Sequence, residues 1–165
     1  MEKINQLKKL IYHHKLDGYI IPKNDEFFGE YIPENKDRLK FISGFSGSYG
    51  FALILKNKNY LFVDGRYTLQ AKIQSGKLFK IITIPNQFPS DILKKRKMHI
   101  GFDPKLHTKK SLELFFKKKD CKLLSINQNL VDKLWIAKRN VDFEGEYRSP
   151  GWERFKKNKM LKWKK

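Results

Sequence analysis

Short apolar runs alternate with amphipathic stretches along most of this chain, and this alternation limits the available folds more than any other feature. Runs such as "YIIP" (19–22) and "FKIITI" (79–84) have the length and β-branched content of buried strands. Residues 2–15 instead carry apolar side chains at helical spacing. Helices and strands in alternation predict an α/β class fold, a single domain with a mixed β-sheet flanked by helices.

The order of the expected elements follows from the same patterns. Strands are expected at 19–22, 51–55, 60–64, 79–84, 99–103 and 121–126, and helices at 2–15, 66–75, 91–97, 109–119 and 129–135. The short polar turn "KNKN" between the second and third strands predicts a hairpin. Residues 23–40 are polar and contain Pro33, so we expect them to lie outside the framework.

The pattern ends near residue 140. We therefore predict a domain over 1–139 and a basic C-terminal tail over 140–165 that is disordered or aberrant, as in a sequence read out of frame. An alternative stays open. Trp152, Phe155, Met160 and Trp163 would share one side of a basic amphipathic helix, as in segments that bind membrane surfaces or calmodulin.

The formal net charge of +19 makes nucleic acid or an anionic membrane the first partner to consider. The cations are 30 Lys and only 6 Arg, however, and 15 Ile and 10 Asn accompany them, as AT-rich codons would produce. Lysine lacks the planar fork that suits arginine to phosphates and bases. We favour a solvated lysine surface and keep the basic binding protein as an alternative function.

Two smaller observations indicate the cellular compartment of the protein. No apolar run is long enough to span a bilayer, and the N-terminus lacks a signal-peptide core. The one cysteine, Cys121, excludes an internal disulfide and fits a reducing compartment. We therefore expect a cytoplasmic protein.

The stretch "FISGFSGSYG" (41–50) contains three glycines, Gly44, Gly47 and Gly50, among three serines. A phosphate-binding Walker loop needs a lysine after its last glycine and then a helix, but a strand follows here. A nucleophile elbow needs glycines two residues before and after its serine, and no serine here meets that spacing. The loop is therefore predicted to be structural.

Other candidate chemistry is sparse. Asp64 ends an expected strand beside Arg66, which predicts either an ion pair in which the aspartate also caps a helix, or an arginine that faces a substrate. The four histidines lack the local spacing of a metal site.

Six ordered motifs lie within residues 7–139. They are Asp17 with "YI.P" (19–22), "EY" (30–31), "FISGF.GS.G" (41–50), "DGRY..QA" (64–71), "GFDP..HT" (101–108) and "N.VD..W" (129–135). Together they resemble the N-terminal domain of Xaa-Pro aminopeptidases (aminopeptidase P), in the creatinase/prolidase N-terminal domain superfamily.

The resemblance implies a domain normally followed by a "pita-bread" catalytic domain of metallopeptidase family M24. In that family the catalytic domain is a hydrolase that removes an N-terminal residue preceding proline, using two metal ions, usually manganese. The 26 residues after Arg139 are too few for such a domain. We therefore assign no catalytic residue, no metal ligand and no cofactor to this chain.

The resemblance also implies roles in subunit contacts and in one wall of the substrate approach. The positions carried over for these roles are Arg38, Phe45, Asp64, Arg66 and Tyr67. One departure is that relatives often have "HQSEY" where this chain has "FFGEY", so a histidine is replaced by Phe27.

The favoured hypothesis is a non-catalytic, truncated or split aminopeptidase P fragment. Its partner would be a catalytic domain supplied in trans or a second copy. A second alternative is a subunit that works with a separately encoded catalytic domain.

Overall fold

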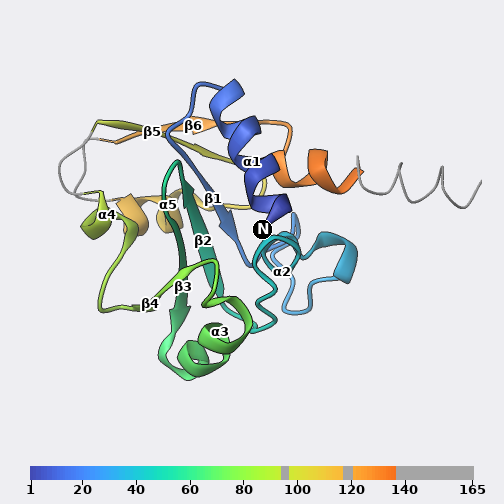
Figure 1. Ribbon diagram of the computed structural model, residues 1–165, viewed down its shortest axis with the longest axis vertical. Helices are drawn as coiled ribbons and strands as arrows, with labels where there is room; N and C mark the ends of the chain where they lie inside the picture. The colour runs from blue at the N-terminus through green and yellow to red at the C-terminus, as the bar shows by residue number, and fades with distance from the viewer. Residues whose placement is uncertain (94–96, 117–120, 137–165) are drawn as a thin grey trace, which may run out of the picture. The chain divides into compact units, whose positions relative to one another are not determined.

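The structure, a computed structural model, describes residues 1–93, 97–116 and 121–136. Residues Met1–Asp132 form one compact unit built on a six-stranded sheet in the order β4-β3-β2-β1-β5-β6 (Figure 1). The strands are β1 (Gly18–Pro22), β2 (Gly50–Leu55), β3 (Asn59–Asp64), β4 (Lys80–Ile84), β5 (Met98–Phe102) and β6 (Cys121–Ser125). All six expected strands are present, each within two residues of its predicted bounds.

The sheet is mixed, as the sequence predicts. β1 pairs antiparallel with β2, and β2 with β3, so the expected hairpin at "KNKN" is confirmed. The β1–β5, β5–β6 and β3–β4 pairs are parallel. β1 therefore lies near the middle of the sheet, and all five of its residues are buried.

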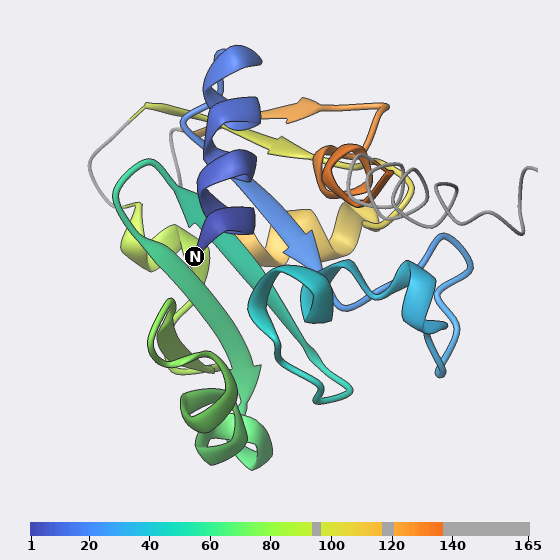
Figure 2. The same ribbon diagram turned by 45° about the vertical axis from the view of Figure 1, so that its right-hand side comes forward.

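Helices cover both faces of the sheet (Figure 2). They are α1 (Glu2–His13), α2 (Arg38–Ser43), α3 (Thr68–Ser75), α4 (Pro89–Ile92) and α5 (Lys109–Phe116), with 3-10 turns η1 (Glu34–Lys36) and η2 (Gly65–Tyr67). α1, α2 and α3 lie on one side of the sheet, and α4 and α5 lie on the other. On the α5 side, the Phe51 ring stacks on Phe62 and Phe115, with ring centroids 4.6 and 4.1 Å apart.

One local prediction is wrong. Helix α2 begins inside the segment 23–40, which was expected to lie outside the framework. The helix starts there because the Asp37 side chain accepts a hydrogen bond from the Lys40 backbone N–H at 3.0 Å and caps its first turn. Leu39 and Ile42 of α2 are buried in the core.

Two other predictions fall partly or wholly on residues outside the described ones. The helix expected over 91–97 is described only as the short α4, and the tail 140–165 lies entirely outside the description. In the described part of the chain, no helix has the length and apolarity needed to cross a membrane.

Candidate functional site

The loops that carry the sequence motifs gather at one edge of the sheet. β1, β3 and β5 all run toward this edge, and β2 starts from it, as the pairing of Gly50 with Val63 shows. The backbone N–H of Lys23, just after β1, donates to the Gly50 carbonyl at 2.9 Å. Ligands of α/β sheets commonly bind at the carboxyl ends of strands, so this edge is the first place to look for a site.

The glycine-rich loop turns sharply between α2 and β2. Gly44 ends α2 with φ = +77°, a left-handed conformation that other residues adopt only with strain. The Phe45 ring is buried and lies directly against Gly47, where an added Cβ would collide with it. Phe45 therefore belongs to the core beneath the loop.

Polar side chains fasten this loop to α3. The Ser46 backbone N–H donates to the Gln74 side chain at 3.0 Å, and the Ser46 hydroxyl accepts from Gln70 and Gln74 at 3.0 and 2.9 Å. The Ser48 hydroxyl lies 2.7 Å from the Tyr67 hydroxyl. The two motifs at 41–50 and 64–71 thus form one hydrogen-bonded unit.

Asp64 and Arg66 form an ion pair at the end of β3. The Asp64 carboxylate accepts from the Arg66 backbone N–H at 2.8 Å, which caps η2, and from the Arg66 side chain at 2.8 and 3.1 Å. Hydrogen bonding to Arg66 lowers the pKa of Asp64. The pair and the cap predicted from sequence are present; a contact between Arg66 and a substrate stays a prediction.

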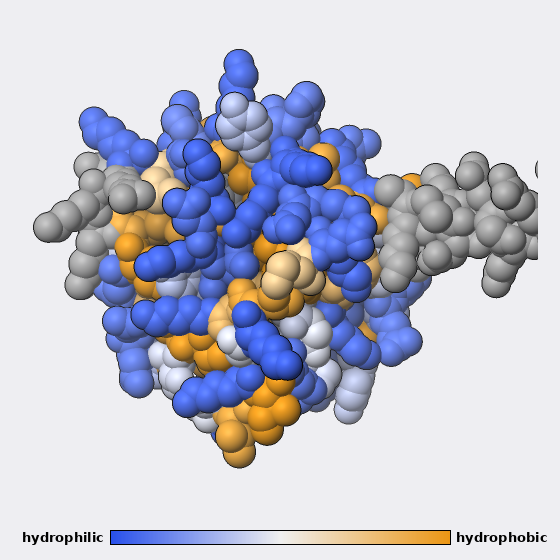
Figure 3. All heavy atoms as spheres, in the orientation of Figure 1, coloured by the Kyte–Doolittle hydropathy of each residue, from blue (hydrophilic) through white to orange (hydrophobic). Residues whose placement is uncertain are grey.

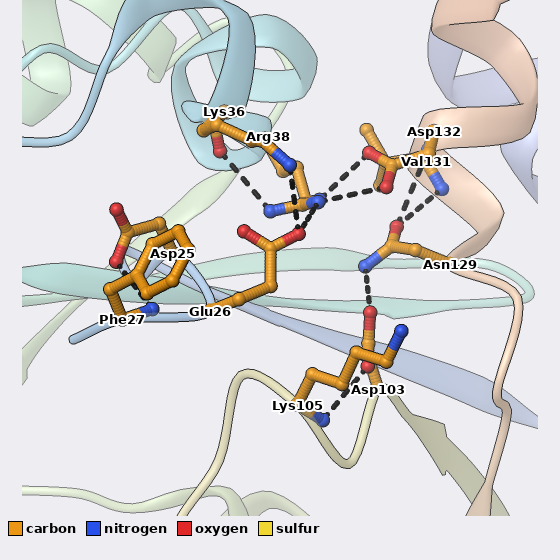
Figure 4. A network of polar contacts seen from close by, with 10 residues as sticks. All are labelled: Asp25, Glu26, Phe27, Lys36, Arg38, Asp103, Lys105, Asn129, Val131 and Asp132. Atoms are coloured by element: carbon orange, nitrogen blue, oxygen red, sulfur yellow. Dashed lines mark hydrogen bonds and ion pairs between the residues drawn. The ribbon is translucent and has the colours of Figure 1, made fainter.

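Arg38 stands at the centre of a buried polar network (Figure 4). Its guanidinium donates to both carboxylate oxygens of Asp132 at 2.7 and 2.8 Å and to Glu26 at 2.7 Å. The arginine side chain is 2% exposed. Burial alone would raise the pKa of Glu26, but hydrogen bonds from Arg38 and Lys36 outweigh it and lower this pKa to about 2.

A second polar contact joins the two last motifs. The Asn129 amide donates to Asp103 at 2.8 Å, and the Asn129 side-chain oxygen accepts from the Val131 backbone N–H at 2.9 Å (Figure 4). Nearby, His107 is buried edge-on to the Phe102 ring, and burial lowers its pKa to about 4. Its imidazole is therefore neutral at neutral pH.

The segment after β1 presents aromatic side chains to solvent. Phe27 and Tyr31 are 85% and 87% exposed, and Phe28, at φ = +54°, is about half exposed. The buried Asp25 carboxylate holds the turn by accepting from the Phe27 and Gly29 backbone N–H groups at 3.0 and 3.1 Å. We call residues 25–31 the aromatic loop.

Comparison with known proteins decides what this arrangement belongs to. The family model of the creatinase/prolidase N-terminal domain matches residues 3–134. The chain belongs to the creatinase/prolidase N-terminal domain family.

The relatives that match this domain are larger proteins. A probable Xaa-Pro aminopeptidase P from Laccaria bicolor is 37% identical over 144 residues, covering 81% of this chain and 22% of the relative. An aminopeptidase P1 from Lotus japonicus is 35% identical and covers 80% of this chain and 21% of the relative. The chain thus spans about a fifth of the length of the curated relatives that it matches.

Solved structures agree with this assignment. X-prolyl aminopeptidase from Caenorhabditis elegans, described as a cytosolic enzyme with a di-nuclear active site, is 30% identical with a TM-score of 0.73, covering 82% of this chain and 25% of that one. The N-terminal domain of the cytoplasmic peptidase PepQ from Mycobacterium tuberculosis shares the fold, with a TM-score of 0.61 at 21% identity, covering 81% of this chain and 98% of that one.

The described residues of this creatinase/prolidase N-terminal domain do not fit a di-nuclear metal centre. No group of three or more His, Cys, Asp or Glu side chains lies close enough within them to hold a metal ion. The carboxylates nearest the strand ends are already engaged, Glu26 and Asp132 by Arg38 and Asp64 by Arg66. We derive no metal chemistry from this domain.

Sequence reasoning named Arg38 but missed its partners in this creatinase/prolidase N-terminal domain. Asp132 lies within the quoted motif "N.VD..W", so the motif was a usable signal for it. Glu26 lies in a segment expected to be irregular, and no local pattern marks it. The exposed aromatic loop was likewise noticed only as a departure from "HQSEY".

Proposed function

We propose that this domain is the non-catalytic N-terminal module of an Xaa-Pro aminopeptidase-like metallopeptidase. It would dock against a catalytic domain and form part of the wall along which the peptide substrate approaches. The family and the relatives support the module. The docking role rests on the aromatic loop. Hydrogen bonds to the buried Asp25 carboxylate fix its backbone, while the rings of Phe27 and Tyr31 are exposed to solvent.

The support beneath the loop is substantial. Asp25 closes the turn, and Glu26, the next residue, is tied to Arg38 and through it to Asp132. Phe28 is held in a left-handed conformation that is uncommon for a bulky residue. Exposed aromatic side chains on a fixed backbone lose little conformational entropy when a partner covers them, which suits an interface.

The peptide-bond chemistry would belong to the catalytic domain. The Caenorhabditis elegans relative is described as having a di-nuclear active site, so that domain would hold two metal ions, manganese by the resemblance, and they would supply Lewis-acid activation of water. This chain would contribute a docking surface for the catalytic domain and part of the wall along which the substrate approaches. We also propose a cytosolic location, because the Caenorhabditis elegans relative is described as cytosolic.

A domain exchange tests the docking role. Residues 1–136 would replace the matching segment of the Caenorhabditis elegans enzyme, and turnover of an Arg-Pro-Pro peptide would be measured with added Mn²⁺. We expect the chimera to retain activity and Phe27→Ala/Tyr31→Ala to lower its kcat/KM at least tenfold. Tyr12→Ala, which removes a 79% exposed ring from α1, is the matched control and should change nothing. Equal activity of all three chimeras would contradict the docking role.

The purified chain tests whether the module is non-catalytic. We expect no proline-specific turnover with Mn²⁺ at any concentration, and turnover by the chain alone would overturn the proposal. The finer hypothesis is that the catalytic domain has been lost by truncation or is encoded separately, and the DNA sequence of the gene is needed to test it. Reading all three frames past codon 139 would test it, and no pita-bread coding sequence there would count against it.

A further inference from the structure

The outer face of α3 carries an apolar strip that nothing in the described structure covers. Leu69 and Ile73 lie one helical turn apart and are 71% and 75% exposed. Gly76, the C-cap of the helix, adds no side chain beside them. Figure 3 shows apolar residues gathered over the α3 region on a face that is otherwise mostly hydrophilic.

The opposite face of α3 accounts for its place in the fold. Ala71 and Ser75 are buried against the sheet, and Ser75 donates to the Ser43 carbonyl at 2.9 Å. Gln70 and Gln74 hold Ser46 of the glycine-rich loop. Packing of the domain therefore does not require large apolar side chains at the two exposed positions.

The charges around the strip have one sign. Lys72 and Lys77 are exposed beside it, and the sequence has no Asp or Glu from Gly65 to Ser90. The nearest carboxylate along the chain, Asp64, is already paired with Arg66. A partner that covers this strip must therefore bring apolar side chains at its centre and negative charge at its rim.

We propose that the α3 strip binds an acidic amphipathic helix of a partner protein. Apolar residues at i, i+3 and i+4 of that helix would lie along Leu69 and Ile73, and flanking carboxylates would meet Lys72 and Lys77. A second copy of this chain does not fit, because a symmetric contact would bring the same lysines together and both copies carry a net charge of +19. The strip shares no residue with the aromatic loop, so binding at α3 would be a role separate from the proposed function.

The test uses two synthetic 16-residue peptides with identical leucine positions, one with Glu and one with Lys at the polar positions. Titrations of the ¹⁵N-labelled full chain would follow amide chemical shifts. We expect the Glu peptide to shift α3 amides and to bind at least tenfold tighter than the Lys peptide. Leu69→Ser/Ile73→Ser should weaken the Glu peptide at least tenfold, and Lys72→Glu/Lys77→Glu should reverse the peptide preference.

The matched controls are Tyr12→Ser, a similarly exposed apolar residue on α1, and Lys9→Glu, and both should bind like the parent. Circular dichroism melting curves would verify that every variant is folded. Equal affinity for the two peptides, shifts confined to other elements, or unchanged binding by Leu69→Ser/Ile73→Ser would overturn the proposal. So would a dimer in analytical ultracentrifugation that Leu69→Ser/Ile73→Ser dissociates, because the occupant would then be a second copy.

Discussion

At the scale of single residues, Arg38 shows how one buried charge can join distant parts of a chain. It begins α2, yet its partners are Glu26 and, 94 residues away, Asp132. Burial would lower the pKa of the guanidinium, but the two carboxylates raise it, so the group stays charged. The network is therefore a strong structural constraint whatever else the residue does in a larger assembly.

Replacing Arg38 with methionine should lower the free energy of unfolding by about 2–4 kcal/mol, because Asp132 would lose the cation that contacts both of its oxygens and Glu26 would keep only Lys36. This is below the usual range of about 3–5 kcal/mol for broken buried pairs, since the Asp132 and Glu26 side chains are partly exposed. Urea denaturation at pH 7 would measure the change. Arg66→Met is the control: its ion pair with Asp64 is exposed and screened by solvent, so this substitution should leave the urea midpoint nearly unchanged.

Gly44 has a conformation that its sequence position alone does not reveal. Gly44→Ala should destabilise the domain by about 1–2 kcal/mol, because a Cβ is strained at φ = +77°. Gly65→Ala is the comparison, since an added Cβ there would meet only Thr83, at an ordinary contact distance of 3.9 Å, and the φ of Gly65 lies outside the left-handed region. Thermal denaturation of both variants checks the prediction; an equal effect at the two positions would contradict it.

At the scale of elements, the glycine-rich loop and α3 behave as one piece. The loop that leads into β2 is hydrogen-bonded to α3 and to the turn before it. Gln70 and Gln74 donate to the Ser46 hydroxyl, and the Tyr67 hydroxyl lies within hydrogen-bond distance of the Ser48 hydroxyl. The loop is thus rigid because a helix that follows it in sequence returns to lie beside it.

Removing the Gln74 side chain should loosen this loop without unfolding the domain. Two hydrogen bonds to Ser46 are lost, so Gln74→Ala should cost about 1 kcal/mol. Native-state hydrogen exchange should show the Ser46 amide, which loses its acceptor, exchanging at least fivefold faster, while β2 amides speed up by no more than the loss of global stability requires. Gln6→Ala, which removes an exposed contact within α1, should leave Ser46 unaffected.

At the scale of the whole domain, acid should lower stability through the groups whose pKa differs between the folded and unfolded chain. His107 titrates near 4 when folded and near 6.5 when unfolded, so unfolding takes up a proton in this interval. The stability present above pH 6.5 is therefore lost as the pH falls toward 4. Glu26, with its pKa lowered to about 2, adds a further loss below pH 4.5.

Replacing His107 with leucine separates these two contributions. The parent should lose up to about 3 kcal/mol between pH 6.5 and 4, and His107→Leu should lose far less over that interval. Both proteins should still lose stability below pH 4.5 through Glu26. Urea midpoints at pH 7, 5.5 and 4.5 and at about pH 3 provide the measurement, and parallel curves for the two proteins between pH 7 and 4.5 would contradict the role of His107.

Apolar periodicity and short motifs are local properties, so the six strands, the hairpin, most helices and the family resemblance can be predicted from the residues alone. The Asp64–Arg66 pair can be predicted too, because its members are two residues apart. The contacts between distant side chains become visible only in the folded chain: Arg38 with Asp132, Ser46 with Gln74 and Asn129 with Asp103. These contacts depend on strand order and direction, which bring the motif loops to one edge of the sheet, and no local pattern encodes that order.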